Sequence, residues 1–258
     1  MFRLDALLAN KEKEVRHKRL VAPEEALLRR PCPPLRDFAS ALKKQGLSVI
    51  AEVKRKSPSA GTLRRDFDPA EIARSYAKAS AAALSVLTDR DYFGGREDDI
   101  LRAKQECPLP VLRKEFIVDA YQIVESRVIG ADAVLLIVRI LSEERLRLFL
   151  DLAESLGLAC LVETHDEREV ETALRAGAKI IGVNNRDLGT LSADLGTSLK
   201  LAAGIPNDVT KVSESGIRTR EDVRMLRDAG FDALLIGETL LRAGEIQRTI
   251  KDMLKVEG

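Results

Sequence analysis

The hydrophobic residues of this chain gather in short runs that alternate with longer amphipathic stretches. From residue 47 onward this alternation repeats eight times. The runs cover residues 47–54, 82–89, 111–115, 133–138, 159–164, 179–184, 210–215 and 233–237. Runs of this length predict strands, and strands that alternate with helices predict a parallel sheet. We therefore expect an α/β fold, a (β/α)8 TIM barrel, with a doubly wound open sheet as the alternative.

Residues typical of helix ends mark the stretches between the runs. The expected N-terminal caps are Asp68 before Pro69, Asp119, Ser142 and Thr219, and the expected helix stops are Gly130, Gly157, Gly177 and Gly230. Residues 1–45 hold two further helical stretches around the break Pro31-Cys32-Pro33-Pro34. They predict an N-terminal helical extension packed on a barrel of residues 46–258, within a single domain overall.

The composition disfavours several classes of partner and site. The chain has 42 Lys+Arg and 41 Asp+Glu, so its net charge of +1 gives no general attraction to nucleic acid or an anionic membrane. Its three cysteines form no CxxC and it has only two histidines, so we expect neither a disulfide framework nor a metal site. Dinucleotide and P-loop motifs, a signal peptide and a run of 18 apolar residues are all missing from the sequence, which predicts a cytoplasmic protein.

Charged residues occupy the ends of several predicted strands. Glu52 and Lys54 share one face of the first strand, while Lys114 and Glu163 each lie two positions after a leucine and so share its face. If these faces point inward, the barrel mouth holds two lysines and, with Glu214, three glutamates. Unpaired buried ions lose several kcal/mol of hydration each, so these groups must pair with one another or bind a ligand. A ring of salt bridges closing the barrel is the alternative without function.

The last two strand ends favour a ligand. Ser215-Gly216 follows the seventh strand and Gly237 follows the eighth, where barrels of this class bind phosphate groups. Residues 238–242 after Gly237 predict one short extra helix, whose first N–H groups would face a phosphate dianion. The pattern predicts a small phosphorylated substrate as the partner, with neither nucleic acid nor a membrane.

Six segments together resemble the indole-3-glycerol phosphate synthase family over nearly the whole chain. They are IAEVKRKSPSAG, SVLTDRDYFGG, PVLRKEFIVDAYQIVESRVIGADAVLLIV, LVETHDEREVETALRAGAKIIGVNNRDL, SESGI and LIGETLLRA. The resemblance implies a carboxy-lyase of tryptophan biosynthesis that uses no metal or cofactor. It converts 1-(2-carboxyphenylamino)-1-deoxyribulose 5-phosphate to indole-3-glycerol phosphate, carbon dioxide and water.

The resemblance also implies roles for four charged residues. Lys114 is expected to be the acid that meets the ribulose carbonyl oxygen, with its pKa lowered by burial and neighbouring cations. Lys54 is expected to assist departure of the hydroxyl group, although the sequence leaves open which lysine serves which step. Glu163 is the expected general base. Glu52 is the expected second catalytic carboxylate, placed where it would hold Lys54.

Further residues are implied to bind the substrate. They are Lys56, Ser57 and Pro58 on the first loop, Asn184, Arg186, Glu214 and Ser215 as polar contacts, Phe93, Phe116 and Leu135 as an apolar wall, and Ser215, Gly216, Gly237 and Glu238 for the phosphate. The Glu238 side chain is expected to face solvent, because a carboxylate repels phosphate. His165 is expected to be solvated and to have no catalytic role.

Two other functions are compatible with a phosphate-binding barrel. Phosphoribosylanthranilate isomerase would require a Cys base after the first strand and an Asp acid after the sixth, where this chain has Glu52 and Asn184. A non-catalytic or engineered phosphate-ligand-binding barrel would need only the phosphate-binding loops. The presence of Lys114 and Glu163 favours the synthase.

Overall fold

The computed structural model describes residues 4–43, 46–58, 60–64, 66–187 and 189–254. Within these residues eight parallel strands close into a barrel, in which β1 pairs with both β4 and β10. The barrel strands are β1 (Ser48–Val53), β4 (Ala83–Leu87), β5 (Val111–Lys114), β6 (Ala133–Ile137), β7 (Ala159–Thr164), β8 (Ile180–Asn184), β9 (Thr210–Glu214) and β10 (Ala233–Ile236). The TIM-barrel prediction is therefore confirmed, and the alternative prediction of a doubly wound open sheet is wrong.

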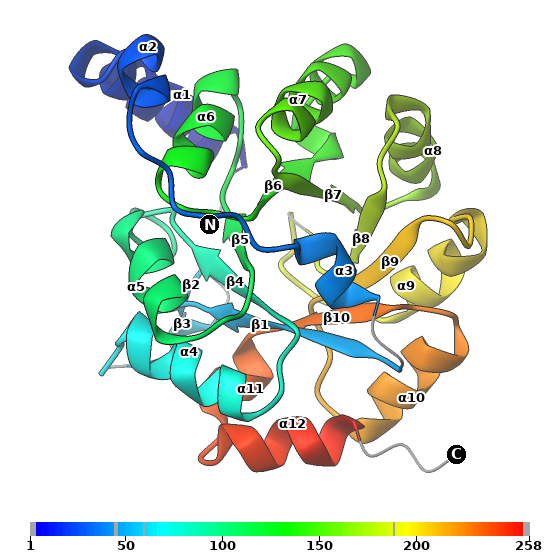
Figure 1. The fold of residues 1–258 in the computed structure, drawn as a ribbon. Helices are drawn as coiled ribbons and strands as arrows, with labels where there is room; N and C mark the ends of the chain where they lie inside the picture. The colour runs from blue at the N-terminus through cyan, green and yellow to red at the C-terminus, as the bar shows by residue number, and fades with distance from the viewer. Residues whose placement is uncertain (1–3, 44–45, 59, 65, 188, 255–258) are drawn as a thin grey trace.

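Helices surround the barrel, as Figure 1 shows. They are α4 (Pro69–Lys78), α5 (Asp98–Glu106), α6 (Ala120–Val128), α7 (Glu143–Ser155), α8 (Glu167–Ala176), α9 (Gly196–Leu201), α10 (Arg220–Asp228), α11 (Glu238–Arg242) and α12 (Ile246–Leu254), with 3-10 turns η1 (Val138–Ile140) and η2 (Ala202–Gly204). All four predicted side-chain caps accept a backbone N–H, and all four predicted stop glycines have positive φ. Local sequence therefore sets these eight helix boundaries.

Alternate strand residues point into the barrel. Ile50, Leu112, Leu161 and Val212 belong to one buried cluster inside it, whereas the intervening Val162 packs in the cluster between strands and helices. This alternation confirms that the charged residues two positions beyond these inward residues face the barrel interior. The sequence predicted this from the period of two along a strand.

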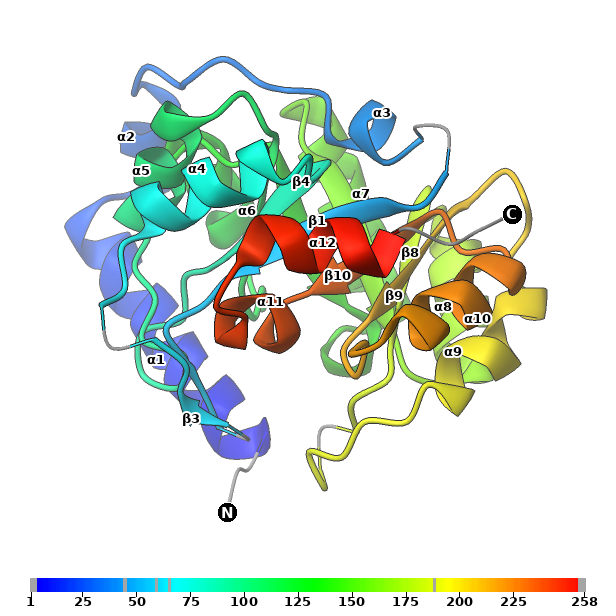
Figure 2. The same cartoon turned by 90° about the horizontal axis from the view of Figure 1, so that it is seen from below.

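The N-terminal segment contributes α1 (Leu4–Val21), α2 (Glu24–Leu28) and α3 (Phe38–Leu42). Phe38 and Leu42 are buried in the barrel-interior cluster, and Figure 2 places α3 toward one end of the barrel and the short β2 (Lys56–Ser57) and β3 (Gly61–Thr62) hairpin toward the other. Leu7 of α1 is buried in the same cluster, so both helical ends of the segment contact the barrel. The division between residues 45 and 46 stays a prediction, because residue 45 lies outside the described residues.

A buried lysine joins α1 to the loops that carry the barrel mouth. The Lys11 side chain is 2% exposed, and its Nζ lies 3.1 Å from carboxylate oxygens of both Asp89 and Glu115, on the loops after β4 and β5. Glu115 directly follows Lys114, so α1 braces the strand end that presents this lysine. In the part of the chain that is described, no helix is long and apolar enough to cross a membrane.

Candidate active site

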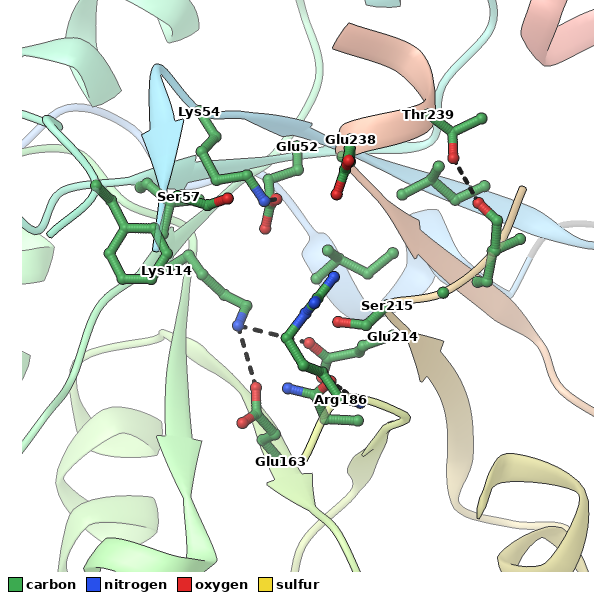
Figure 3. A pocket seen from close by; sticks show the side chains of 18 of the residues that line it. Glu52, Lys54, Ser57, Lys114, Glu163, Arg186, Glu214, Ser215, Glu238 and Thr239 are labelled. Atoms are coloured by element: carbon green, nitrogen blue, oxygen red, sulfur yellow. Dashed lines mark hydrogen bonds and ion pairs between the residues drawn. The ribbon is translucent and has the colours of Figure 1, made fainter. Parts of the chain in front are cut away.

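A cavity of about 430 Å³ opens at the C-terminal ends of the strands. This volume is in the range of sites for small organic ligands. Its lining includes Glu52, Lys54, Lys114, Glu163, Asn184 and Glu214, one or two residues from each of five strand ends (Figure 3). Charged groups far apart in the sequence therefore meet around one cavity, as the strand-end pattern predicts.

Two lysines and three carboxylates form the charged part of the cavity. Lys54 Nζ pairs with Glu52 Oε1, and Lys114 Nζ lies 3.1 Å from Glu163 Oε2 and 3.6 Å from Glu214 Oε2. The lysine side chains are 14% and 15% exposed, whereas the Glu163 and Glu214 side chains are almost fully buried. Each lysine thus has one close carboxylate, and Glu214 is the third.

The surroundings of Lys114 differ from those expected. Burial alone would lower the pKa of Lys114, but the nearby carboxylates, Glu163 first, outweigh burial and hold the pKa above its ordinary value. The expected lowered pKa is therefore wrong, because acids and not other cations surround the ammonium. Lys114 consequently remains protonated, which is the form that a proton donor requires.

The two carboxylates beside Lys114 have opposite pKa shifts. Burial would raise the pKa of Glu163, but Lys114 and then His165 outweigh it and lower that pKa. Burial raises the pKa of Glu214 to about 8, opposed by Lys114 and assisted by the negative charge of Glu163. Within the described residues, neither Glu214 oxygen has a hydrogen-bond partner. Near neutral pH, Glu163 is therefore the ionised base and Glu214 holds its proton.

The loops after β9 and β10 lie together at the cavity rim. Ser215 and Gly216 have φ of 67° and 79°, and Thr239 Oγ1 donates 2.6 Å to the Ile217 carbonyl, which links the two loops. A Cβ on Gly237 would lie 2.2 Å from Glu52 Oε1, because β1 and β10 are neighbours. Only glycine fits at residue 237 without displacing the Glu52 carboxylate.

Comparison with known proteins identifies the family. The indole-3-glycerol phosphate synthase family model matches residues 4–253. The chain belongs to the indole-3-glycerol phosphate synthase family. The synthase of Acetivibrio thermocellus is 54% identical over 221 residues, 85% of each chain. Indole-3-glycerol phosphate synthase 2 of Streptomyces coelicolor is 48% identical over 253 residues, 97% of this chain and 98% of that relative.

Solved structures support the fold alone. The N-acetylmannosamine-6-phosphate 2-epimerase from Clostridium perfringens superimposes with a TM-score of 0.63 at 14% identity, over 87% of this chain and 99% of that one. At this identity the likeness carries the barrel architecture and no shared chemistry.

The cavity brings together nearly all the site residues expected of a synthase. Besides the charged group, it is lined by Ser57, Pro58, Phe93, Phe116, Leu135, Asn184, Arg186, Ser215, Gly216, Gly237 and Glu238. Lys56 is not in this lining, since its Nζ donates 2.8 Å to the Asp91 carbonyl. Lys56 therefore does not reach the cavity in this conformation of the loop.

Hydrogen bonds and a ring contact hold several of the lining residues in place. Asn184 Oδ1 accepts from the Arg186 backbone N at 3.0 Å, and Arg186 Nη1 donates 2.6 Å to the Leu191 carbonyl. The Phe93 and Phe116 rings contact each other with centroids 6.2 Å apart. The cavity lining thus includes a pair of contacting aromatic rings as well as the charged group.

The Glu238 side chain is 37% exposed and its carboxylate accepts 3.0 Å from Arg242 Nε, which agrees with a side chain that faces solvent, although Glu238 is also among the residues that line the cavity. One expectation about a single residue is wrong. The His165 side chain is only 4% exposed and lies against Glu163, so it is not solvated. Each of these two side chains has a partner four residues later in the chain, Arg242 for Glu238 and Glu169 for His165. Side chains four residues apart lie close together on a helical turn, so the sequence already contained this signal.

Sequence reasoning missed several lining residues. Ile137, Leu235, Arg218, Thr239 and Arg242 also line the cavity. The period of two identifies Ile137 and Leu235, which share the inward face of Leu135 and Gly237 respectively. The positions of Arg218 and of Thr239 and Arg242 in α11 depend on how the loops fold. The sequence gives no periodic signal for that folding. Among the described residues, no group of three or more His, Cys, Asp and Glu is arranged to hold a metal ion.

Replacing Glu214 with glutamine should stabilise the fold at alkaline pH. The folded chain keeps the Glu214 proton up to about pH 8, whereas the unfolded chain releases it near the ordinary value of 4.5. Between these values the folded state binds more protons, so this group's contribution to stability is largest below pH 4.5 and is lost as pH rises through 8. We expect the variant to gain about 2 kcal/mol, or roughly 4–8 °C in Tm, over the unsubstituted protein at pH 8.5 and little at pH 5.

Calorimetry at the two pH values measures this difference. The exposed Glu221→Gln is the matched control and should show no such trend. A Tm difference for Glu214→Gln that is the same at both pH values would contradict an ionisation that is suppressed by burial.

Replacing Gly237 with aspartate should weaken substrate binding. The new Cβ would overlap Glu52 Oε1, and the added charge would repel a phosphate at the rim. We expect KM to rise about tenfold or more, since about 1.4 kcal/mol of lost binding corresponds to a factor of ten. Gly244→Asp is the control, because nothing lies within 4 Å of a Cβ there. An unchanged KM in Gly237→Asp would argue against phosphate binding at this loop.

Proposed function

We propose that this cavity converts 1-(2-carboxyphenylamino)-1-deoxyribulose 5-phosphate to indole-3-glycerol phosphate, with loss of carbon dioxide and water. The observation that carries the proposal is the position of Lys114, 3.1 Å from Glu163 in a cavity of a chain that belongs to the synthase family. A protonated amine beside an ionised carboxylate supplies an acid and a base to one bound substrate.

Ring closure uses the acid. The anthranilate ring carbon that bears the carboxylate attacks the ribulose carbonyl carbon, and the carbonyl oxygen gains negative charge. The Lys114 ammonium stabilises that oxygen and donates a proton to it. Carbon dioxide then leaves, and the electron pair of the broken carbon–carbon bond restores the aromatic ring. The raised pKa of Lys114 ensures that its proton is present at the start of this step.

Dehydration uses the base. Glu163 removes a proton from the carbon next to the new bond, the C–H electron pair forms the indole double bond, and the hydroxyl group departs. Lys54 donates the proton that turns the departing hydroxide into water, while Glu52 holds the Lys54 ammonium. One proton is taken up by Glu163 and two are given by the lysines, which balances the charge lost with the substrate carboxylate.

Substrate binding is assigned to the rest of the lining. Phe93, Phe116 and Leu135 contact the anthranilate ring, and Ser215, Gly216 and Gly237 hold the phosphate through backbone N–H groups and the Ser215 hydroxyl. Asn184 and Arg186 orient the substrate between these two ends, with Ser57 and Pro58 covering it. Lys56 has no assigned contact, since its amine is held by the Asp91 carbonyl.

Indole fluorescence tests the proposal directly. The protein contains no tryptophan, so an indole product would be seen against a dark background. We expect a rising indole signal with one carbon dioxide released per indole formed. Folded protein that gives neither signal with this substrate would overturn the proposed function. Isomerase activity is disfavoured because β1 presents Glu52 to the cavity where that reaction would need a cysteine.

A further inference from the structure

A lysine of α1 is buried against the loops after β4 and β5, which carry the two phenylalanines of the cavity. The Lys11 side chain is 2% exposed, and its Nζ lies 2.8 Å from Glu14 Oε2, 3.1 Å from Asp89 Oδ2 and 3.1 Å from Glu115 Oε1. Burial would lower the pKa of Lys11, but the carboxylates, Glu115 first and Asp89 next, outweigh burial and raise it. Lys11 is therefore a cation that contacts both loops, and the reaction above makes no use of it.

Asp89 holds the backbone of the loop that carries Phe93. Its Oδ1 accepts hydrogen bonds from Tyr92 N at 2.8 Å and from Phe93 N at 3.2 Å. Its Oδ2 is the oxygen that contacts Lys11, and the Asp89 side chain is as deeply buried as the lysine. The two oxygens of one carboxylate thus connect Lys11 to the backbone of Phe93.

Glu115 holds the backbone of Phe116 in the same way. Its Oε1 accepts 2.9 Å from Phe116 N and also contacts Lys11, while its Oε2 accepts 2.7 Å from Thr88 Oγ1. Thr88 Oγ1 in turn accepts 3.2 Å from Arg113 Nε, so this second cation reaches Glu115 only through a hydroxyl group. Lys11 is the cation in direct contact with the oxygen that holds Phe116.

The two sets of contacts end at the ring pair in the cavity. Phe93 and Phe116 both line the cavity, and their ring centroids lie 6.2 Å apart. One nitrogen atom, Lys11 Nζ, therefore links the backbone positions of both rings. Without a cation between them, two buried carboxylates repel each other and move toward water, and the N–H groups that they hold are released.

We propose that Lys11 is a positioning residue that sets the spacing of the Phe93 and Phe116 rings for the aromatic part of the substrate. It does so by holding Asp89 and Glu115 together. Lys11 is not in the cavity lining, so it acts on the substrate only through these two loops. The inference rests on the proposed function, because it takes the two rings to be the contact with the anthranilate ring.

The Lys11→Met variant tests the kinetic consequence, since methionine keeps the length of the side chain and removes its charge. A ring contact made equally in the bound substrate and in the transition state affects KM, so KM should rise about tenfold while kcat changes less than about threefold. Inorganic phosphate has no ring, so its Ki as a competitive inhibitor should change less than about twofold. Lys13→Met, at an exposed position of the same helix, is the matched control with all three constants unchanged.

Three results in Lys11→Met would overturn the proposal. An unchanged KM would mean that the rings keep their positions without the lysine. A KM and a phosphate Ki that rise by the same factor would mean a general loosening of the barrel mouth. A fall in kcat without a rise in KM would mean that Lys11 acts through Lys114, which precedes Glu115.

Adding Glu115→Gln to the Lys11→Met variant tests the role of charge. The glutamine oxygen can still accept from Phe116 N, but the neutral amide needs no cation beside it and does not repel Asp89. We expect KM to fall again by about threefold or more relative to Lys11→Met. A KM that stays at the level of Lys11→Met would contradict a positioning role that depends on the ammonium charge.

Hydrogen exchange of the unsubstituted protein gives a readout that needs no variant to fold. The amides of Phe93 and Phe116 donate to buried carboxylates, so both should exchange about a hundredfold or more slower than unprotected amides. Where Lys11→Met folds, both amides should lose protection together. Exchange of either amide at the unprotected rate in the unsubstituted protein would overturn the proposal.

The readouts separate this inference from the proposed function. Protein that forms indole, and whose Lys11→Met variant keeps its KM, would remove the inference and leave the synthase assignment intact. Folded protein in which both amides are protected but which forms no indole would remove the proposed function, and with it the role of the rings toward this substrate.

Discussion

The Lys114→Ala variant should lose about three orders of magnitude or more in kcat, with KM changed only a few-fold. Lys114 is proposed to meet the carbonyl oxygen, which becomes strongly negative only as the ring closes, so its contribution is made in the transition state. Loss of one oxyanion-stabilising group typically lowers kcat by about 10²–10³, and loss of the donated proton adds to this. Steady-state indole formation measures both constants.

Lys179→Ala is the matched control for that variant. Lys179 directly precedes β8, at the end of the barrel opposite the cavity, and its side chain is 78% exposed. Its replacement should leave both kinetic constants unchanged. A Lys114→Ala variant with near-normal kcat would mean that another group is the acid.

The loss of Lys114 should also change the remaining acid–base groups. Lys114 is the strongest influence that lowers the pKa of Glu163 against the effect of burial, and it opposes the rise in the pKa of Glu214. Without the ammonium, the pKa of Glu163 rises, and a higher pH is needed to ionise the base. We therefore expect the acid limb of the pH profile of residual activity to move to higher pH in Lys114→Met, which keeps the length of the side chain.

The barrel and the meeting of its charged groups could be predicted from sequence for a simple physical reason. Parallel strands covered on both faces appear as apolar runs, and the period of two fixes which residues face inward. Once Leu112 and Leu161 are assigned to the interior, Lys114 and Glu163 must follow them there. The predicted short helix after Gly237 is also present, as α11.

Pairing between charges could not be predicted in the same way. The direction of the pKa shift of Lys114 on β5 depends on whether acids or bases are its nearest neighbours. Those neighbours, Glu163 and Glu214, come from β7 and β9, which are not adjacent to β5, so the pairing depends on which inward side chains meet across the closed barrel. The contacts of Lys11 with Asp89 and Glu115 depend on how α1 docks, which no periodicity specifies. His165 is the intermediate case, since Glu169 lies four residues on, yet its contact with Glu163 comes from the turn between β7 and α8.

The Glu163→Gln variant should separate the two halves of the reaction. Glutamine has nearly the same size but accepts no proton, so ring closure and decarboxylation proceed while dehydration stops. We expect kcat for indole formation to fall by about 10²–10⁴, the range for loss of a general base. Carbon dioxide release should outrun indole formation in the first turnover, because the hydroxylated, decarboxylated intermediate accumulates.

Rapid-mixing measurements that follow carbon dioxide and indole fluorescence together detect that accumulation. Glu167→Gln is the matched control, since its side chain is 56% exposed at the start of α8 and pairs with Lys200 away from the cavity. The control should release carbon dioxide and form indole at equal rates, as we expect of the unsubstituted protein. If Glu163→Gln forms indole at the normal rate, the base is another group, and because Glu214 holds its proton near neutral pH, Glu52 would be the carboxylate to replace next.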